Sequence, residues 1–261
     1  MLGRPFLLLQ ARDLDDPMIQ HEIDSFRSAM GLTEDELRVH NAVESLPSVD
    51  DLNGVGGVLI GGSGDYSVLD AEPWIRSMVD WARQELVLAG KPTFASCFGF
   101  QILVLAIGGQ MIRDHANTEM GTYDLRLHDA ASDDPLFTQM PRLFAAQVGH
   151  HDRAEALPSG VMTYASSPAC PVHAFRVGNL PIWATQFHPE LSLSGLRTRY
   201  EHYRDQYAPD VDLPIEEDPF ILSLRPSDEA SLLLALFVRW VRQHDQSLLW
   251  SSADSVSTPD R

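Results

Sequence analysis

Basic residues and cysteines are scarce in this sequence. Its 261 residues contain 19 lysines and arginines against 37 aspartates and glutamates, which gives a formal net charge of −18. Nucleic-acid surfaces depend on clustered Lys and Arg that contact phosphates, so this composition disfavours a nucleic-acid partner. The two cysteines, Cys97 and Cys170, cannot build a disulfide framework, and in a reducing compartment each is a free thiol. A reactive thiol can therefore lie at either position.

Long apolar runs are also missing. The first apolar segment, residues 6–10 (FLLLQ), is too short for a signal peptide or a membrane span, and no other segment approaches about 18 consecutive apolar residues. We therefore expect a cytoplasmic protein without a membrane partner. A hydrophobic content of 44% is ordinary for a globular protein and allows a substantial core in a chain of this length.

The N-terminal part of the chain alternates between two patterns. Short apolar runs typical of buried strands occupy residues 6–10, 39–43, 57–60 and 93–96. Helical patterns occupy residues 17–30, 74–88 and 98–107. This alternation predicts an α/β fold, a flavodoxin-like three-layer sandwich with a mostly parallel central sheet.

The remainder of the chain has a different texture. From about Met111 onward, short strand-like runs are separated by Pro, Gly and Asp turns, which indicates mixed strands with hairpin connections. Residues of about 200–226 are acidic and contain prolines, so we expect an irregular excursion there. An amphipathic helix is predicted over 227–242 and a flexible tail over 246–261. We therefore expect a single domain over residues 1–245.

Cys97 lies in the segment FASCFGFQ (94–101), where a predicted strand passes directly into a predicted helix. A tight strand-to-helix turn lifts one side chain above the sheet edge and requires small neighbours, which Ala95, Ser96 and Gly99 supply. Ligands of open α/β sheets bind at this edge. The helix N-terminus also favours a thiolate over a thiol. Cys97 is therefore either a nucleophile or a small buried core thiol.

A thiolate that attacks a carbonyl needs an imidazole to move protons and a third group to orient that imidazole. The segment QFHPE (186–190) follows a strand-like run, which places His188 at the strand end with Glu190 in reach. The alternative for His188 is a capping or surface histidine. The glycine-rich segment GGSG (61–64), directly after a buried strand, either offers backbone N–H groups for an oxyanion hole or is simply a glycine turn.

Two other interpretations of these segments are weaker. The run GGSGDYS (61–67) lacks the GK[ST] of a phosphate-binding P-loop. A metal site could draw on His150, His151, Asp152, His188 and Glu190, but a catalytic triad already uses the last two. We therefore expect neither a metal nor a cofactor.

Taken in order, the segments IGGSG, SCFGFQ and QFHPE resemble the class I, or triad-type, glutamine amidotransferases. The likeness is greatest to the amidotransferase domain of GMP synthetase and its stand-alone relatives. It covers about residues 6–191, and a weaker similarity continues through 225–240 (RPSDEASLLLALFVRW). Two departures stand out: the family usually has glycine where this chain has Ala95, and its GGPxSV loop is replaced here by the longer GGSGDYSV (61–68).

The resemblance implies a glutamine-hydrolysing triad. Cys97 would attack the side-chain amide carbon of glutamine, release ammonia and leave a γ-glutamyl thioester that water hydrolyses. His188 would act as general base and acid, and Glu190 would orient it.

The resemblance also implies a set of residues that hold the substrate. Gly62 and Ser63, together with the N–H of Phe98, would form the oxyanion hole, and Gln101 would contact the substrate. The run His150-His151-Asp152 resembles the HGD segment of the family, which helps to hold the ends of glutamine. A polar turn is the alternative for His151 and Asp152.

Three classes of function remain open. The first is a glutaminase that feeds ammonia to a separate synthetase subunit. The second is a free-standing hydrolase of another small γ-glutamyl amide, and the third is a non-enzymatic scaffold of the same fold. The intact Cys97, His188 and Glu190 count against the scaffold.

Overall fold

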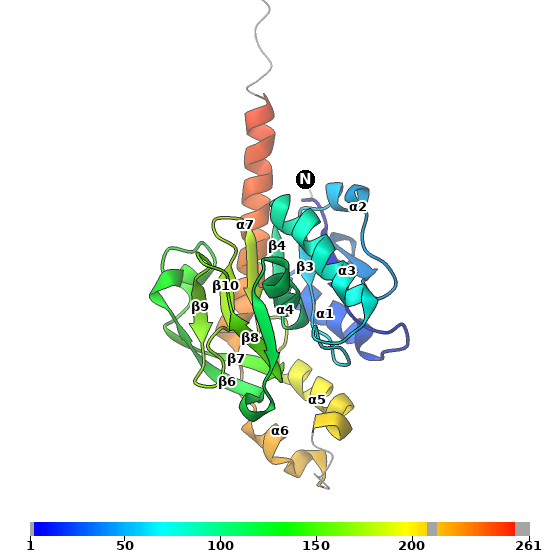
Figure 1. Cartoon of the computed structure of the whole chain (residues 1–261), viewed down its shortest axis with the longest axis vertical. Helices are drawn as coiled ribbons and strands as arrows, with labels where there is room; N and C mark the ends of the chain where they lie inside the picture. Colours follow the sequence, from blue (N-terminus) through cyan, green and yellow to red (C-terminus); the bar gives the residue numbers. More distant parts are fainter. Residues whose placement is uncertain (1–2, 208–212, 254–261) are drawn as a thin grey trace, which may run out of the picture.

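A nine-stranded sheet forms the centre of the computed structural model, which describes residues 3–207 and 213–253 (Figure 1). The strands follow the order β2-β1-β3-β4-β11-β10-β9-β6-β7. They are β1 (Phe6–Gln10), β2 (Leu37–Asn41), β3 (Gly57–Ile60), β4 (Thr93–Ser96), β6 (Glu119–Leu127), β7 (Leu143–His150), β9 (Thr163–Ser166), β10 (Ala174–Arg176) and β11 (Ile182–Thr185). A separate antiparallel pair is formed by β5 (Gln110–Arg113) and β8 (Asp152–Ala156).

The first five strands in this order, β2-β1-β3-β4-β11, pair in parallel, whereas the strands from β10 to β7 are antiparallel. Every residue of β1, β3, β4 and β11 is buried. Parallel strands covered on both faces have continuous apolar sequences because neither face meets water. The predicted α/β fold with a largely parallel central sheet is confirmed.

The helices cover both faces of this sheet. They are α1 (Met18–Met30), α2 (Val49–Asn53), α3 (Pro73–Trp81), α4 (Phe98–Ala106), α5 (Leu193–Tyr207), α6 (Pro219–Ser223) and α7 (Asp228–Ala253). A π-helical segment, η2 (Ala82–Leu88), continues α3. Short 3₁₀ turns are η1 (Glu34–Glu36), η3 (His115–Asn117), η4 (Asp129–Ala131), η5 (Phe137–Gln139) and η6 (Ile215–Glu217).

Strand β1 shows how the three layers form. Phe6 and Leu8 join a core cluster that also contains Phe26 of α1 and Phe237 of α7. Their neighbours on the strand, Leu7 and Leu9, join a second cluster that includes side chains of α3 and α4. Side chains alternate across a strand, so one apolar run supplies both cores.

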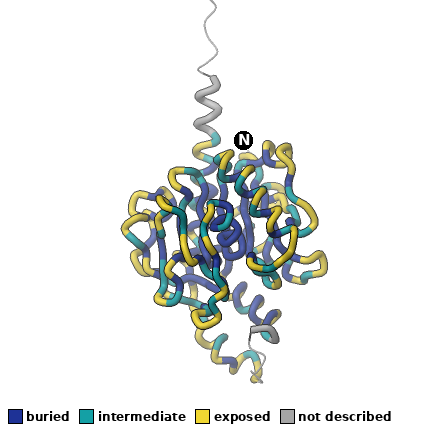
Figure 2. Tube along the Cα trace, in the orientation of Figure 1, coloured by how far each residue is buried: buried dark blue, intermediate teal, exposed yellow. Residues whose placement is uncertain are grey.

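Helix α4 is buried almost completely. Each of its residues except Leu105 is buried, and the helix lies at the dark centre of Figure 2. Its sequence is therefore apolar around its whole circumference rather than along one stripe. The polar Gln101 is buried on this helix, which is a costly place for an amide without hydrogen-bond partners. The Gln101 amide has such partners, because its Nε2 donates to the carbonyl of Asp152 and to Gln186 Oε1.

Several predicted boundaries differ from the structure. The second strand begins and ends two residues before the predicted 39–43, and the helix predicted over 74–88 changes to the π form after Trp81. The predicted irregular excursion contains most of α5 and all of α6.

The C-terminal helix also exceeds its prediction. Helix α7 passes the predicted end at residue 242 and continues to Ala253, because no glycine or proline interrupts it. The part of the predicted tail over 254–261 lies outside the described residues. Over residues 3–207 and 213–253, none of the helices has both the length and the apolar character that a membrane crossing requires.

Candidate active site

Cys97 occupies a strained turn between β4 and α4. Its φ of 51° and ψ of −105° make it the single non-glycine residue with positive φ in the described ranges. The turn is tied down because the Cys97 N–H donates to the carbonyl of Thr185 at 2.8 Å, and the Gly99 N–H donates to that of Gly61 at 3.0 Å. A Cβ at position 99 would lie 2.5 Å from the carbonyl oxygen of Ile60, so glycine is required there. Strained backbone of this kind is concentrated at functional sites.

Cys97 is 6% exposed, and its thiol faces polar groups. Its Sγ lies 3.8 Å from the carbonyl oxygen of Gly149, and Gln186 Nε2 donates to the Sγ at 3.8 Å. The next residue, Phe98, begins α4, so its N–H has no partner within the helix. The thiol therefore lies beside a backbone donor that a developing oxyanion can use.

His188 and Glu190 form a buried pair next to this thiol. His188 Nδ1 is 2.7 Å from Glu190 Oε1. Burial lowers the pKa of His188, but the charges of Cys97 and Glu190 and the hydrogen bonds to them outweigh burial and raise this pKa to about 9. Burial raises the pKa of Glu190, and the His188 imidazolium outweighs it to lower that pKa to about 2. The surroundings thus favour the charged imidazolium form of His188, held between Cys97 and the Glu190 carboxylate.

Gly62 lies close to both Cys97 and His188. A Cβ on Gly62 would lie 3.0 Å from His188 Cε1 and 3.7 Å from Cys97 Cβ. A larger residue at position 62 would therefore press on the imidazole. The structure brings Cys97, His188, Glu190 and Gly62 together.

A cleft of about 370 Å³ opens onto Cys97. Five residues predicted for the oxyanion hole or for substrate binding line it, namely Ser63, Phe98, Gln101, His151 and Asp152. Cys97 and five of the predicted substrate residues therefore share one cavity, whereas Gly62, His188 and Glu190 are not part of its lining.

Two of the cleft residues are held by short hydrogen-bond chains. Gln101 Nε2 donates at 3.4 Å to the carbonyl of Asp152 and at the same distance to Gln186 Oε1. The Asp152 carboxylate accepts from the hydroxyl of Ser67 and, at 3.2 Å, from Arg113 Nε. These bonds fix a carboxylate, an amide and a guanidinium in the wall, which can recognise the charged ends of an amino acid.

Sequence reasoning missed Arg199, which lies on α5 behind the triad. Its Nη1 is 3.5 Å from Glu190 Oε1 and 3.4 Å from His188 Nδ1, and its guanidinium is one cause of the low pKa of Glu190. No motif marks this residue, which lies between the QFHPE segment and the predicted excursion of about 200–226. Gln186, by contrast, could have been found, since it begins the pentapeptide QFHPE and precedes His188 by two residues on the same strand end.

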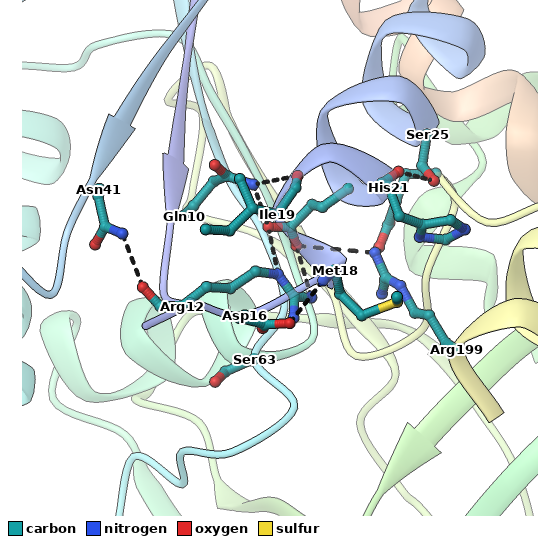
Figure 3. Close-up of polar contacts among 12 residues, drawn as sticks. Gln10, Arg12, Asp16, Met18, Ile19, His21, Ser25, Asn41, Ser63 and Arg199 are labelled. Carbon is teal, nitrogen blue, oxygen red and sulfur yellow. Dashed lines mark hydrogen bonds and ion pairs between the residues drawn. The ribbon is translucent and has the colours of Figure 1, made fainter. Parts of the chain in front are cut away.

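Arg199 also joins a buried ionic network that extends to β1 and α1. Its Nη2 is 3.8 Å from Glu22 Oε1, and Glu22 Oε2 accepts from Arg12 Nε at 3.0 Å. The Arg12 Nη1 then donates to Asp16 at 2.7 Å and to the hydroxyl of Tyr203 at 2.9 Å. Figure 3 shows Arg12 and Arg199 approaching this network from different parts of the chain.

This network explains two glycines of the GGSG segment. A Cβ at Gly61 would lie 2.6 Å from Glu22 Oε1, and a Cβ at Gly64 would lie 2.3 Å from the Tyr203 ring. The glycines at 61 and 64 are thus required by the ion network behind the loop. At Gly62 the imidazole in front of the loop leaves little room for a side chain.

Comparison with known proteins identifies the family. The family described as glutamine amidotransferase class-I matches residues 29–202, so the chain belongs to it. One subunit of the glutamine-hydrolyzing GMP synthase of Methanocaldococcus jannaschii is 34% identical over 101 residues, which cover 39% of this chain and 52% of that protein. The GMP synthase of Porphyromonas gingivalis is 32% identical over 143 residues, which cover 54% of this chain and 26% of that protein. The aligned part thus spans about half, or less, of these relatives.

Solved structures show the same fold. A glutamine amidotransferase from Thermotoga maritima matches with a TM-score of 0.71 and 17% identity, covering 93% of this chain and 100% of that one. A glutamine amido transferase from Methylobacillus flagellatus gives a TM-score of 0.64 and 16% identity, covering 100% of this chain and 98% of that one. The predicted resemblance to this family is confirmed.

Proposed function

We propose that the chain hydrolyses the side-chain amide of glutamine through a γ-glutamyl thioester on Cys97. The observation that carries this proposal is the strained Cys97 turn beside an imidazole whose pKa is raised by both the thiolate and Glu190. Membership in the class-I glutamine amidotransferase family supports the same activity.

The reaction begins with attack of the Cys97 thiolate on the amide carbon. The carbonyl oxygen becomes an oxyanion that the N–H of Phe98 and the backbone of Gly62 and Ser63 stabilise. His188, as imidazolium, then gives its proton to the leaving nitrogen, the C–N bond breaks, and ammonia departs. The products of this half-reaction are ammonia and the thioester.

The second half-reaction uses the same groups in reverse order. The neutral imidazole of His188 removes a proton from water, which attacks the thioester carbon. The C–S bond breaks, glutamate leaves, and the thiolate and imidazolium are restored. Glu190 keeps the imidazole oriented in both steps. These steps balance without a cofactor.

The substrate is held in the cleft in front of Cys97. We assign Gln101, His151 and Asp152 to binding the glutamine, with Arg113 as the positive charge nearest to the Asp152 carboxylate. A pocket of about 370 Å³ is at the lower end of the size that encloses drug-sized ligands, roughly 300–1,000 Å³. This volume favours a second candidate function, the hydrolysis of a γ-glutamyl amide with a small substituent on its nitrogen.

A separate synthetase subunit is the proposed recipient of the ammonia. Relatives from Methanocaldococcus jannaschii and Thermococcus kodakarensis are each named as one subunit of a GMP synthase, which implies a second subunit in those organisms. We also propose a cytoplasmic location, because Cys97 must stay reduced to act.

The test is release of glutamate from glutamine by the purified protein without ATP. Parallel reactions with γ-glutamyl amides of small amines separate the two candidate substrates. A cysteine-directed glutamine analogue should label Cys97 and leave Cys170 unlabelled. Failure of every substrate together with failure of labelling would favour the non-enzymatic scaffold.

A further inference from the structure

A second cluster of chemically versatile side chains adjoins the active-site cleft, because one of its members, His150, lines that cleft. It consists of Glu119, His150, Cys170 and His173, and all four are buried. One donor atom from each residue lies within 4.8 Å of the donor atoms of the others. The mechanism proposed above uses none of the four.

The cluster is assembled from neighbouring strands. Glu119 begins β6, His150 ends β7, and these two residues face each other in the antiparallel register. His173 directly precedes β10, and Cys170 lies in the connection from β9. Figure 1 shows these strands side by side in one half of the sheet.

The two imidazoles converge on one carboxylate oxygen. His173 Nε2 is 2.8 Å from Glu119 Oε2, and His150 Nε2 is 3.2 Å from the same atom but out of line for a hydrogen bond. Within the described residues, both ring nitrogens of His150 and the Nδ1 of His173 lack hydrogen-bond partners. Unsatisfied buried polar atoms are unfavourable and call for an explanation.

Hydrogen bonds hold the other donor groups in place. The hydroxyl of Ser167 donates to Glu119 Oε1 at 2.6 Å and accepts from the N–H of Cys170 at 2.9 Å. The N–H of His173 donates to the carbonyl of Ala165 at 2.7 Å. Metal ligands in proteins are oriented by such bonds, which keep the donor atoms directed at a common point.

We propose that Glu119, His150, Cys170 and His173 are the four ligands of a zinc ion. A thiolate, two imidazoles and a carboxylate form a donor set that suits Zn²⁺. Tetrahedral zinc with bonds of about 2.0–2.3 Å separates its ligand atoms by less than about 4 Å, which is compatible with the observed grouping.

Charge and coordination number agree with this assignment. The thiolate and the carboxylate neutralise the two positive charges of zinc, so the buried site carries no net charge. Binding releases the thiol proton to solvent. Because four protein ligands complete the tetrahedron, the ion serves structure and has no open position for a substrate.

The zinc ion would fix one wall of the active site. His150 follows Gly149, whose carbonyl oxygen is 3.8 Å from Cys97 Sγ, and it precedes the His151 and Asp152 of the cleft. A ligand bond to His150 would therefore hold the end of β7 against the start of β6.

The proposed zinc site is tested by titrating the full chain with metal. Protein stripped by a chelator and then given Zn²⁺ in competition with a chromogenic chelator should bind one ion per chain. Cd²⁺ should give the ultraviolet charge-transfer band of a cadmium thiolate. The chain has two cysteines, so two variants locate this band: Cys97→Ser should keep it and Cys170→Ser should lose it.

The variant His173→Gln adds an independent arm that leaves both thiols in place. It should weaken zinc binding at least about 100-fold, since even residues that only orient a ligand contribute 10–100-fold. Zn²⁺ should raise the melting temperature of the wild type and of Cys97→Ser, but not of His173→Gln. The proposal is overturned if the stripped wild type binds no zinc, if the cadmium band follows Cys97, or if His173→Gln binds zinc like the wild type. Circular dichroism verifies that each variant folds. If Cys170→Ser does not fold, the zinc affinity of His173→Gln and the cadmium band of Cys97→Ser test the proposal.

Discussion

Both cysteines of the chain are buried, yet their surroundings differ in geometry and in charge. Cys97 sits at positive φ on the edge of a cleft, beside an imidazole that its own charge helps to protonate. Cys170 is fully enclosed, and burial raises the pKa of its thiol to about 12 in the metal-free protein. Burial alone therefore says little about the role of a thiol. The backbone conformation at the cysteine and the charged groups that face its sulfur determine that role.

The same contrast applies to the histidines next to each thiol. His188 makes a single short contact to a carboxylate, at 2.7 Å, and lies within reach of Cys97. His150 and His173 share one oxygen of Glu119. The first arrangement lets a proton move between thiol and imidazole, whereas the second gathers several donors around one point.

The largest expected effect on activity comes from replacing one of the two cysteines with serine. Cys97→Ser should lower glutamine hydrolysis by at least about 10³-fold, because a serine hydroxyl has no accessible anion under the same conditions. Cys170→Ser, tested after chelator treatment so that both proteins lack metal, should keep most of the activity because residue 170 does not line the cleft. Glutamate release under saturating glutamine measures both. The opposite ranking would show that the nucleophile is misassigned.

The next largest effect concerns the partner of the thiol. His188→Ala should reduce kcat by about 10²–10⁴-fold, the usual contribution of a positioned acid–base group. Glu190→Gln should cost less, because a misoriented imidazole still transfers protons. Steady-state kinetics of both variants test this order, and a fully active Glu190→Gln would remove the triad from the mechanism.

The triad and its surroundings were predictable where local sequence signals exist. Each signal is a short run of residues that are adjacent in the sequence. The three runs are the small residues around Cys97, the GGSG segment after a buried strand and the QFHPE pentapeptide. The parallel strands were predictable as well, because burial on both faces makes them uniformly apolar.

The ion network could not be predicted in the same way. Arg12 and Tyr203 are hydrogen-bonded although 191 positions separate them in the chain. Glu119 and His173 likewise meet through the order of the strands and not through any fixed spacing. The length of the C-terminal helix was underestimated because its polar end shows no apolar period. The absence of glycine and proline would have indicated the position of the helix end better.

A smaller effect is expected from the buried cation behind the triad. Arg199→Met should lower the free energy of unfolding by about 3 kcal/mol, because it leaves the Glu190 and Glu22 carboxylates without this partner. Arg197→Met on the same helix is the matched control, since Arg197 is half exposed and its pair with Glu201 contributes under about 1 kcal/mol. Urea unfolding of both variants makes the comparison. Equal decreases in the free energy of unfolding would mean that Arg199 contributes no more than an exposed charge does.

The smallest expected effect is a pH dependence of stability that distinguishes the two thiols. In the proposed ion pair the folded protein holds the proton of His188, whose pKa is raised to about 9 from an ordinary value of 6.5, but it has given up the proton of Cys97. An unfolded chain at about pH 7–8 has a neutral imidazole and a protonated thiol, so both states bind the same number of protons and this pair should give the wild type almost no slope. Cys97→Ser removes the thiol from this balance while Glu190 still raises the pKa of His188, so the variant should lose stability as pH rises above 6.5, by under about 1 kcal/mol per pH unit. Cys170→Ser should keep the flat profile of the wild type. Urea unfolding of chelator-treated protein at pH 6, 7 and 8 measures the slopes, and a Cys97→Ser profile identical to that of the wild type would show that the thiol and the imidazole are not paired and weaken the assignment of Cys97 as the nucleophile.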